Sequence, residues 1–193
     1  VGIDALARDR ADVLAIVGSG AQARGQLRGA LAVRDFDEVR VFSPTREHRE
    51  DFARDVDGAV DPAVVSVDSV EDALAGADVV ITATNADHPV IPTDSIEAGM
   101  HINAIGQYHP EKHEVEIETV ELAKYVPDLR DRAFQDAGAF LQARQAGLIR
   151  DDHLYAVDAE TSEPRWTVEL GGKVESTPAV ADDTVYVASK AGT

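Results

Sequence analysis

A glycine-rich turn near the start of the chain limits its possible folds more than any other feature. The apolar run VLAIV (13–17) leads directly into Gly18-Ser19-Gly20, and a helix-like segment begins at Ala21. Glycine at the first position permits a tight turn from strand to helix, and glycine at the third lets a pyrophosphate approach the backbone. The phosphates would then contact free N–H groups at the start of the helix. The turn predicts a dinucleotide-binding βα unit; glycines that serve only a tight turn are the alternative.

Short runs rich in Val and Ile alternate with charged, alanine-rich segments of helical period up to residue 150. This order is typical of βαβ units whose strands form one parallel sheet with helices on both faces. We therefore expect an α/β fold with a Rossmann-type doubly wound sheet. The expected strands are 13–17, 38–42, 64–67, 78–84 and 101–105, and the expected helices are 21–33, 45–56, 69–77 and 131–149.

The end of the second strand indicates which dinucleotide is bound. NAD-binding units usually have an acidic residue there, which accepts a hydrogen bond from the ribose 2′-hydroxyl. Here EVRVF runs instead into Ser43, Pro44, Thr45 and Arg46. Two hydroxyls and a guanidinium suit a 2′-phosphate, so the segment favours NADP, with NAD as the other choice. Alternatively, Arg46 is a solvated residue that pairs with Glu50 on the following helix.

Charge and composition exclude several classes of function. The 193 residues include 36 acidic and 18 basic side chains, for a formal net charge of −18. Nucleic acids and anionic membranes need a positive protein surface, so neither is an expected partner. The absence of cysteine excludes disulfides, thiolate catalysis and Cys-based zinc sites. No apolar run approaches the roughly 18 residues of a membrane helix, and we expect a cytoplasmic protein.

The acidic residues are spread along the chain and accompany few lysines and a hydrophobic fraction of 44%. This combination favours a halophilic protein, because carboxylates keep a surface hydrated in salt that screens their repulsion. An acidic interaction surface is the alternative.

The pattern changes near residue 150. From Leu154 onward, short alternating segments at 154–157, 165–170, 177–181 and 184–189 are separated by polar turns. Such segments predict antiparallel β-structure. We therefore divide the chain into a first domain, 1–150, and a second, 151–193.

Four stretches of the first domain resemble the ornithine cyclodeaminase/μ-crystallin family: VGSGAQARGQL, ADVVITATNADHPVI, EAGMHINAIGQYHPEKHEVE and DAGAFLQARQAGLI. The resemblance implies a Rossmann domain that binds NAD(P) beside an imine or amino-acid substrate, as in ketimine reductases and alanine dehydrogenases, and a homodimer for complete members. It also implies that Gly18, Gly20, Ala21 and Gln22 hold the pyrophosphate, that Thr84 and Asn85 lie along the cofactor, and that Ile105 and Gly106 flank the nicotinamide.

The chain departs from this family in two respects. Cyclodeaminases and archaeal alanine dehydrogenases have a catalytic Asp two residues before a proline, where this chain has Tyr108 before Pro110. A phenol can donate a proton but is not a carboxylate near neutral pH, so imine reduction is favoured over cyclodeamination and the catalytic residues stay unassigned. The resemblance also implies that the chain begins after the family's amino-terminal half, which supplies substrate-binding Lys and Arg and dimer contacts. We expect cofactor binding without turnover.

The carboxyl-terminal residues resemble one blade of a PQQ-type β-propeller. The resemblance rests on Ala156-Val157-Asp158, Thr161 and Trp166, and it implies that Trp166 packs between blades. A single blade cannot bury both of its faces, because repeat folds need about three or more units, so no quinone binding is implied. The alternative function is therefore a non-catalytic nucleotide-binding or scaffold protein that uses this tail for interaction.

The histidines have structural interpretations. His109 and His113 are four residues apart, but Pro110 lies between them, and we expect no metal site. His101, within an apolar strand, is expected to be a hydrogen-bonded structural residue.

Two further polar stretches are weaker signals. Asp87 and His88 follow the fourth strand, at the edge of the sheet where ligands bind, and are candidates for substrate contact. The acid-rich stretch 111–121 is expected to be a solvated face.

Overall fold

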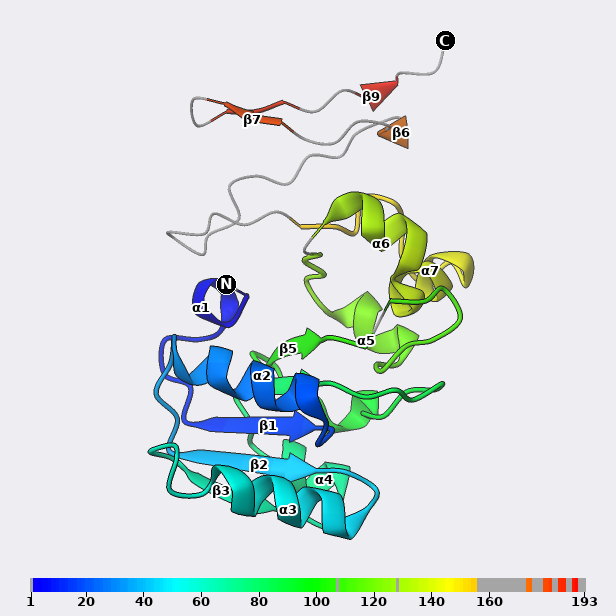
Figure 1. Cartoon of the computed structure of the whole chain (residues 1–193). Coiled ribbons are helices and arrows are strands. Elements are labelled where there is room, and N and C mark those ends of the chain that lie inside the picture. The colour runs from blue at the N-terminus through cyan, green and yellow to red at the C-terminus, as the bar shows by residue number, and fades with distance from the viewer. Residues whose placement is uncertain are drawn as a thin grey trace.

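The computed structural model describes residues 2–106, 108–127 and 129–155, and the backbone of 173–174, 179–181, 184–186 and 189–190. Figure 1 shows the strands of the amino-terminal part side by side, with helices packed along them. Among the described residues, no helix combines the length and apolarity that crossing a bilayer requires.

A five-stranded parallel sheet in the order β3-β2-β1-β4-β5 forms the centre of the fold. Ile16 of β1 pairs with Val41 of β2 on one side and with Ile81 of β4 on the other. The chain proceeds outward from β1 to β3 and then crosses back to β4, which confirms the predicted doubly wound topology. The strands are β1 (Val13–Val17), β2 (Glu38–Phe42), β3 (Ala63–Ser66), β4 (Val79–Thr82) and β5 (His101–Ala104).

Two hydrophobic cores cover the two faces of the sheet. Successive residues of a strand point to opposite faces, so Leu14 and Ile16 join one core while Ala15 and Val17 join the other. The first core includes apolar residues of α2 (Ala21–Leu31) and α3 (Arg46–Val56). The second includes residues of α4 (Val70–Leu74) and α5 (Ile117–Leu122). Burial on both faces explains why the central strands β1 and β4 are almost continuously apolar.

The final helical segment consists of two helices, and the single helix predicted over 131–149 is wrong in this respect. The helices are α6 (Arg130–Asp136) and α7 (Gly138–Gln145), and Ala137 between them is extended, with φ −76° and ψ 90°. The start of α7 packs against a turn of the backbone: a Cβ on Gly138 would lie 2.6 Å from the carbonyl oxygen of His109 and overlap that of Lys112. This tertiary contact fixes where the second helix begins.

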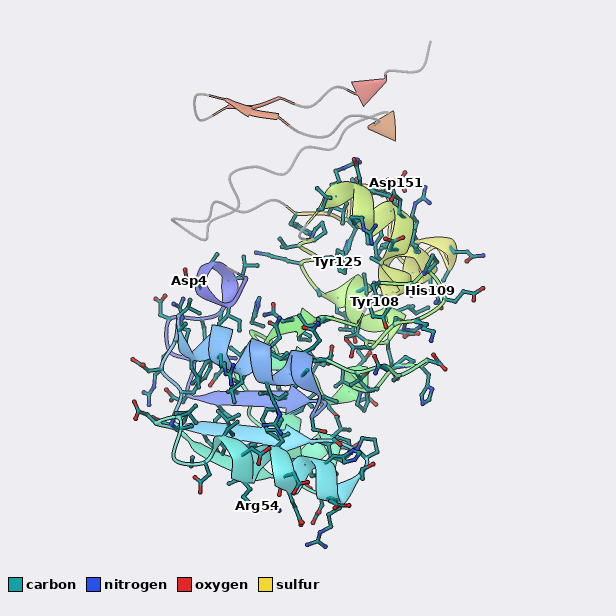
Figure 2. All side chains as sticks on the ribbon, in the orientation of Figure 1. Asp4, Arg54, Tyr108, His109, Tyr125 and Asp151 are labelled. Atoms are coloured by element: carbon teal, nitrogen blue, oxygen red, sulfur yellow. The ribbon has the colours of Figure 1, made fainter. Side chains whose placement is uncertain are left out.

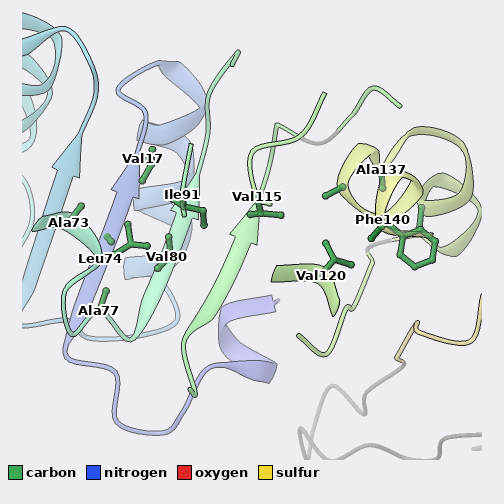
Figure 3. Close-up of a cluster of buried hydrophobic side chains, with 14 of the residues drawn as sticks. Val17, Ala73, Leu74, Ala77, Val80, Ile91, Val115, Val120, Ala137 and Phe140 are labelled. Carbon is green, nitrogen blue, oxygen red and sulfur yellow. The ribbon is translucent and has the colours of Figure 1, made fainter. Parts of the chain in front are cut away.

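Both helices contribute to the core that contains Ala15 and Val17. Figure 3 shows Phe140 of α7 beside Val120 of α5, with Val80 and Leu74 on the sheet side of the same cluster. The ring of Phe140 stacks on Tyr125 with centroids 5.2 Å apart and meets the edge of Phe134 at 5.3 Å. These contacts hold α6, α7 and the segment after α5 together.

The remaining elements lie at the two ends of the chain and between β4 and β5. α1 (Gly2–Leu6) starts against β5, where a Cβ on Gly2 would lie 3.1 Å from Asn103 Oδ1. A short 3₁₀ turn, η1, spans Thr93–Ser95.

Near the carboxyl terminus the described backbone forms two antiparallel pairs. β7 (Ala179–Ala181) pairs with β8 (Thr184–Tyr186), and β6 (Lys173–Val174) pairs with β9 (Ser189–Lys190). The first pair falls within the predicted strands 177–181 and 184–189. The predicted strand at 165–170 and the blade residues 156–158, Thr161 and Trp166 lie outside the described residues.

Candidate functional site

The turn after β1 contacts the ends of both neighbouring strands. Gly18 has φ +118°, a conformation that side-chain-bearing residues rarely adopt, and its N–H donates to the Phe42 carbonyl at 2.8 Å. A Cβ on Gly18 would overlap the carbonyl oxygen of Ala83, just after β4. The turn therefore lies at the point where the strand order reverses, where open α/β sheets bind ligands.

The beginning of α2 leaves space for a ligand directly in front of the helix. Gly20 is the residue that precedes the helix, with φ −80° and ψ −173°, and no side chain caps the first turn. A Cβ built on Gly20 would meet nothing within 4 Å, and Ala21 and Gln22 are exposed. Ala23, by contrast, is fully buried against the sheet. The first N–H groups of a helix have no partner within the helix, so this end can bind an anion.

The segment after β2 lies beside this turn, because Phe42 accepts the hydrogen bond from Gly18. Ser43 is buried, with its hydroxyl 3.5 Å from the Thr45 carbonyl oxygen, and Thr45 precedes α3. Arg46 is exposed and pairs with Glu50 at 2.6 Å, as the alternative interpretation of the sequence expects. Solvent screens such an exposed ion pair and makes it weak, so a phosphate can compete for the guanidinium.

Arg49, which the sequence interpretation missed, holds the same segment in place by a hydrogen bond. Its guanidinium is buried, donating to the Ser43 carbonyl at 3.0 Å and to Asp68 at 2.5 Å. The arginine that follows Arg46 by one turn of α3 is therefore structural. Burial and the two partners, the Ser43 carbonyl and Asp68, distinguish Arg49 from Arg46.

A buried carboxylate lies behind the loops that follow β4 and β5. Glu114 is fully buried and accepts hydrogen bonds from Thr82 Oγ1 at 2.8 Å, Thr84 N at 2.5 Å and Gly106 N at 2.5 Å. The expectation of a solvated face over 111–121 is therefore wrong for Glu114. The reason is that the Glu114 carboxylate accepts hydrogen bonds from donors at the ends of β4 and β5. These donors have no partner within the sheet.

Gly106 is required by this carboxylate. A Cβ on Gly106 would lie 2.7 Å from both carboxylate oxygens of Glu114, closer than any side chain tolerates. Because the N–H of Gly106 already donates to Glu114, it is not available to a ligand. Ile105 N donates in turn to the Thr82 carbonyl at 3.0 Å, and Asn85 is exposed at the end of the neighbouring loop.

The polar residues around Tyr108 lie at the surface, on the segment that follows β5. Tyr108 is 60% exposed, and Figure 2 shows it with His109 on the segment between β5 and α5. Lys112 pairs with Asp87 from the loop after β4, and its hydrogen bond to that carboxyl lowers the pKa of Asp87. The segment after β5 is thus tied to the loop after β4 at its surface as well as through Glu114.

His113 and His101 make hydrogen bonds within the fold. Nδ1 of His113 lies 2.6 Å from the Val115 carbonyl oxygen, and Nε2 lies 3.1 Å from Gln142 Oε1 of α7. His101 is hydrogen-bonded to Asn103 at 3.0 Å, which confirms its expected structural role. Within the described part of the chain, no group of three or more His, Cys, Asp or Glu side chains is arranged to hold a metal ion.

Comparison with known protein families gives two matches. The model of the ornithine cyclodeaminase/mu-crystallin family matches residues 1–161. A second model, described as outer membrane protein assembly factor BamB, matches residues 130–193.

Individual relatives agree with the first match. Ketimine reductase mu-crystallin of Rattus norvegicus is 38% identical over 130 residues, which are 67% of this chain and 40% of that protein. Delta(1)-pyrroline-2-carboxylate reductase of Bacillus cereus is 30% identical over 152 residues, 78% of this chain and 46% of that protein. The chain thus spans less than half the length of these curated relatives.

Solved structures resemble the fold over a similar range. Thermococcus litoralis Delta(1)-pyrroline-2-carboxylate reductase, in complex with NADH and L-proline, aligns with a TM-score of 0.79 and 28% identity, over 83% of this chain and 50% of that one. An archaeal alanine dehydrogenase dimer with bound NAD aligns with a TM-score of 0.74 and 28% identity, over 83% and 49% of the two chains.

Proposed function

This chain belongs to the ornithine cyclodeaminase/mu-crystallin family, and from this premise we propose that residues 1–150 are its NAD(P)-binding domain. The observation that carries the proposal is the contact of the Gly18 turn with the ends of β2 and β4, followed by the open start of α2 at Gly20. A pyrophosphate placed there would receive N–H donors from the first turn of the helix, and no side chain occupies that space.

The two halves of the dinucleotide would extend in opposite directions from this point. Ser19, Ala21 and Gln22 border the pyrophosphate. The adenosine half would lie over β2, towards Ser43 and Thr45, because dinucleotides span the crevice at the reversal of strand order. The nicotinamide half would lie over the ends of β4 and β5, beside Thr84, Asn85 and Ile105, with Gly106 shaping that region through its contact with Glu114.

We propose NADP as the preferred cofactor, with NAD as the alternative. Ser43, Thr45 and Arg46 supply hydroxyls and a cation at the end of β2, and β2 itself ends without an acidic residue. Arg46 would exchange its exposed pairing with Glu50 for the 2′-phosphate, a dianion whose oxygens can accept two parallel hydrogen bonds from the guanidinium. The solved relatives named above bind NAD or NADH, which keeps the alternative open.

The reaction we propose is imine reduction or amino-acid dehydrogenation in the complete protein. The nicotinamide would supply the hydride to, or take it from, the carbon bonded to nitrogen in an imine or amino-acid substrate. Tyr108, exposed beside the nicotinamide end, or solvent would handle the proton. Asp87 and His88 are candidates for substrate contact. The chain spans 40% of its mu-crystallin relative. Turnover and a homodimer are therefore proposed for a protein of that relative's full length.

A fluorescence titration of the purified chain with NADPH and with NADH tests the cofactor proposal. It would be run in about 2 M KCl and in dilute buffer, because the charge of −18 predicts a fold that is stable only in high salt. Saturable binding, tighter for NADPH, is the expected result. No binding to a chain that circular dichroism shows to be folded would overturn it. The expected halophilic and cytoplasmic character is part of the same proposal.

A second candidate function rests on the match of residues 130–193 to the BamB model. In it the first domain binds a nucleotide without catalysis, and the tail docks as a β-propeller-like repeat on a partner. Nucleotide binding with no reductase activity on a cyclic imine, even when a complete relative is active in the same assay, would favour this function. Imine reduction by the protein would contradict it.

A further inference from the structure

Glu114 connects the end of β4, about thirty residues before it, to Gly106, eight residues before it. One carboxylate oxygen accepts from Thr84 N, and the other accepts from Thr82 Oγ1 and Gly106 N. The first two donors belong to the end of β4 and its loop, and the third follows β5. Every donor points at the carboxylate, which is fully buried, and a carboxylate can only accept. The group is therefore the shared acceptor of both loops.

We infer that Glu114 is a positioning residue that sets the gap between the loops after β4 and β5 and so shapes the nicotinamide half of the cofactor site. The inference rests on the proposed function, because it takes those two loops as the walls of that half. Without a carboxylate between them, three donors, two of them fully buried, would lose their acceptor and the loops would rearrange to find others.

The adenosine half of the site makes no hydrogen bond to Glu114. Its one connection to the residues around Glu114 is the packing of Gly18 against the Ala83 carbonyl, and Ala83 is held by its own hydrogen bond to the Val17 carbonyl at 2.9 Å. The pyrophosphate end is formed by Gly18 and the start of α2, and the far end by the segment after β2, which Arg49 holds through the Ser43 carbonyl. None of the hydrogen bonds of Glu114 reaches these segments. A defect at Glu114 should therefore affect the nicotinamide half selectively, whereas a general loss of structure would affect both halves.

The substitution Glu114→Gln separates these possibilities. An amide has the same shape but only one acceptor oxygen. If that oxygen faces Gly106 N and Thr82 Oγ1, the amide N–H groups face the N–H of Thr84, and two donors meet. The best arrangement of the variant thus releases the loop that carries Thr84 and Asn85, while β5 keeps its partner.

The test compares the reduced dinucleotide that binds more tightly to the wild type with the matching ADP-ribose, which lacks the nicotinamide. We expect Glu114→Gln to weaken binding of the dinucleotide by about tenfold, the loss that corresponds to one hydrogen-bonded group. The affinity for ADP-ribose should change by less than about twofold. Equal losses for both ligands, or no loss for either, would overturn the inference.

Glu116→Gln is the matched control. Glu116 also accepts a backbone hydrogen bond, from Thr93 N at 2.7 Å, but it holds η1 and not the loops around Glu114. Glu116→Gln should leave the affinities for the dinucleotide and for ADP-ribose unchanged.

Thr82→Val is the second variant if Glu114→Gln does not fold. It removes one donor, keeps the side-chain shape, and should reduce dinucleotide affinity selectively by a smaller factor. A wild type that binds neither ligand would instead refute the proposed function itself.

Discussion

The α-carbon of Gly18 faces the carbonyl oxygen of Ala83 so closely that no Cβ fits between them. This contact joins the loop after β1 to the loop after β4, which are far apart in sequence. The first loop begins the helix at which we place the pyrophosphate, and the second borders the region in which we place the nicotinamide. The two ends of the proposed cofactor site are therefore built around one glycine.

Gly18→Ala should strongly destabilise the fold. The new Cβ would overlap backbone, which cannot rotate away, and alanine would also be held at φ +118°. We expect a loss of roughly 2–4 kcal/mol, from overpacking and backbone strain together. Urea unfolding monitored by circular dichroism measures the change. A variant as stable as the wild type would show that the loops do not meet as described.

Gly20→Ala should instead impair binding with little effect on stability. The residue has an ordinary φ of −80° and open space around a Cβ, so we expect a stability change of less than about 1 kcal/mol. The methyl group would enter the space proposed for the pyrophosphate and weaken NADPH binding by about tenfold or more. Gly25→Ala, within α2 and also free of clashes, is the control that should bind normally. Unchanged binding by Gly20→Ala would contradict the placement of the pyrophosphate.

Arg46→Ala should reduce the preference for NADPH over NADH. If Arg46 binds the 2′-phosphate, its removal weakens NADPH binding by about tenfold, the value of a charge-assisted hydrogen bond, and leaves NADH binding unaltered. Arg54→Ala is matched, because Arg54 is exposed on the same helix and pairs with Asp51. Comparable titration curves of Arg46→Ala and wild type with NADPH would favour the alternative, in which Arg46 serves only Glu50.

Gly106→Ala and Glu114→Ala should be strongly non-additive. In the wild-type background, the Cβ that Gly106→Ala introduces would lie 2.7 Å from the Glu114 carboxylate oxygens. Once the carboxylate is removed, the same methyl group enters vacated space. We expect the double variant to be more stable than the sum of the two single losses by more than about 1 kcal/mol. Additive losses in urea unfolding would mean that the two residues are not in contact.

His101 should make the fold sensitive to mild acid. Burial lowers the pKa of His101, against the opposing effect of its hydrogen bond to Asn103. The unfolded chain therefore binds the proton more readily, so stability is complete above the unfolded pKa of about 6.5 and decreases as pH falls below it. His101→Gln should lose less stability than the wild type between about pH 7 and about pH 5. Equal losses would assign the acid sensitivity to other groups.

The sheet and its glycine turn were predictable from sequence because their signals are local. Each predicted strand is a short run rich in Val or Ile, and Gly18 and Gly20 follow β1 directly. The same reasoning predicted one helix over 131–149, since Gly138 interrupts the pattern only slightly. Its contact with the carbonyl oxygens of His109 and Lys112 divides that helix in two, and this contact depends on a segment far away in sequence.

Glu114 was missed for the same reason. It stands among other acidic residues, and acidic residues are mostly exposed. Its burial follows from donors at Thr82, Thr84 and Gly106, which come together only when β4 and β5 pair. The one signal in the sequence is the glycine at 106, whose missing side chain makes room for the carboxylate. Likewise, Arg46 and Arg49 look alike in the sequence, and only the packing of α3 separates an exposed arginine from a buried one.

Amide hydrogen exchange with and without saturating NADPH, read by mass spectrometry, tests the central claim most directly, because it locates the bound dinucleotide along the chain. The account predicts slower exchange in residues 18–23 and in the loops around Thr84 and Ile105. It predicts unchanged exchange in α6 and α7, because α7 packs on α5 and α6 packs on α7. Protection confined to other segments, or no protection in a folded chain at a saturating concentration, would contradict it.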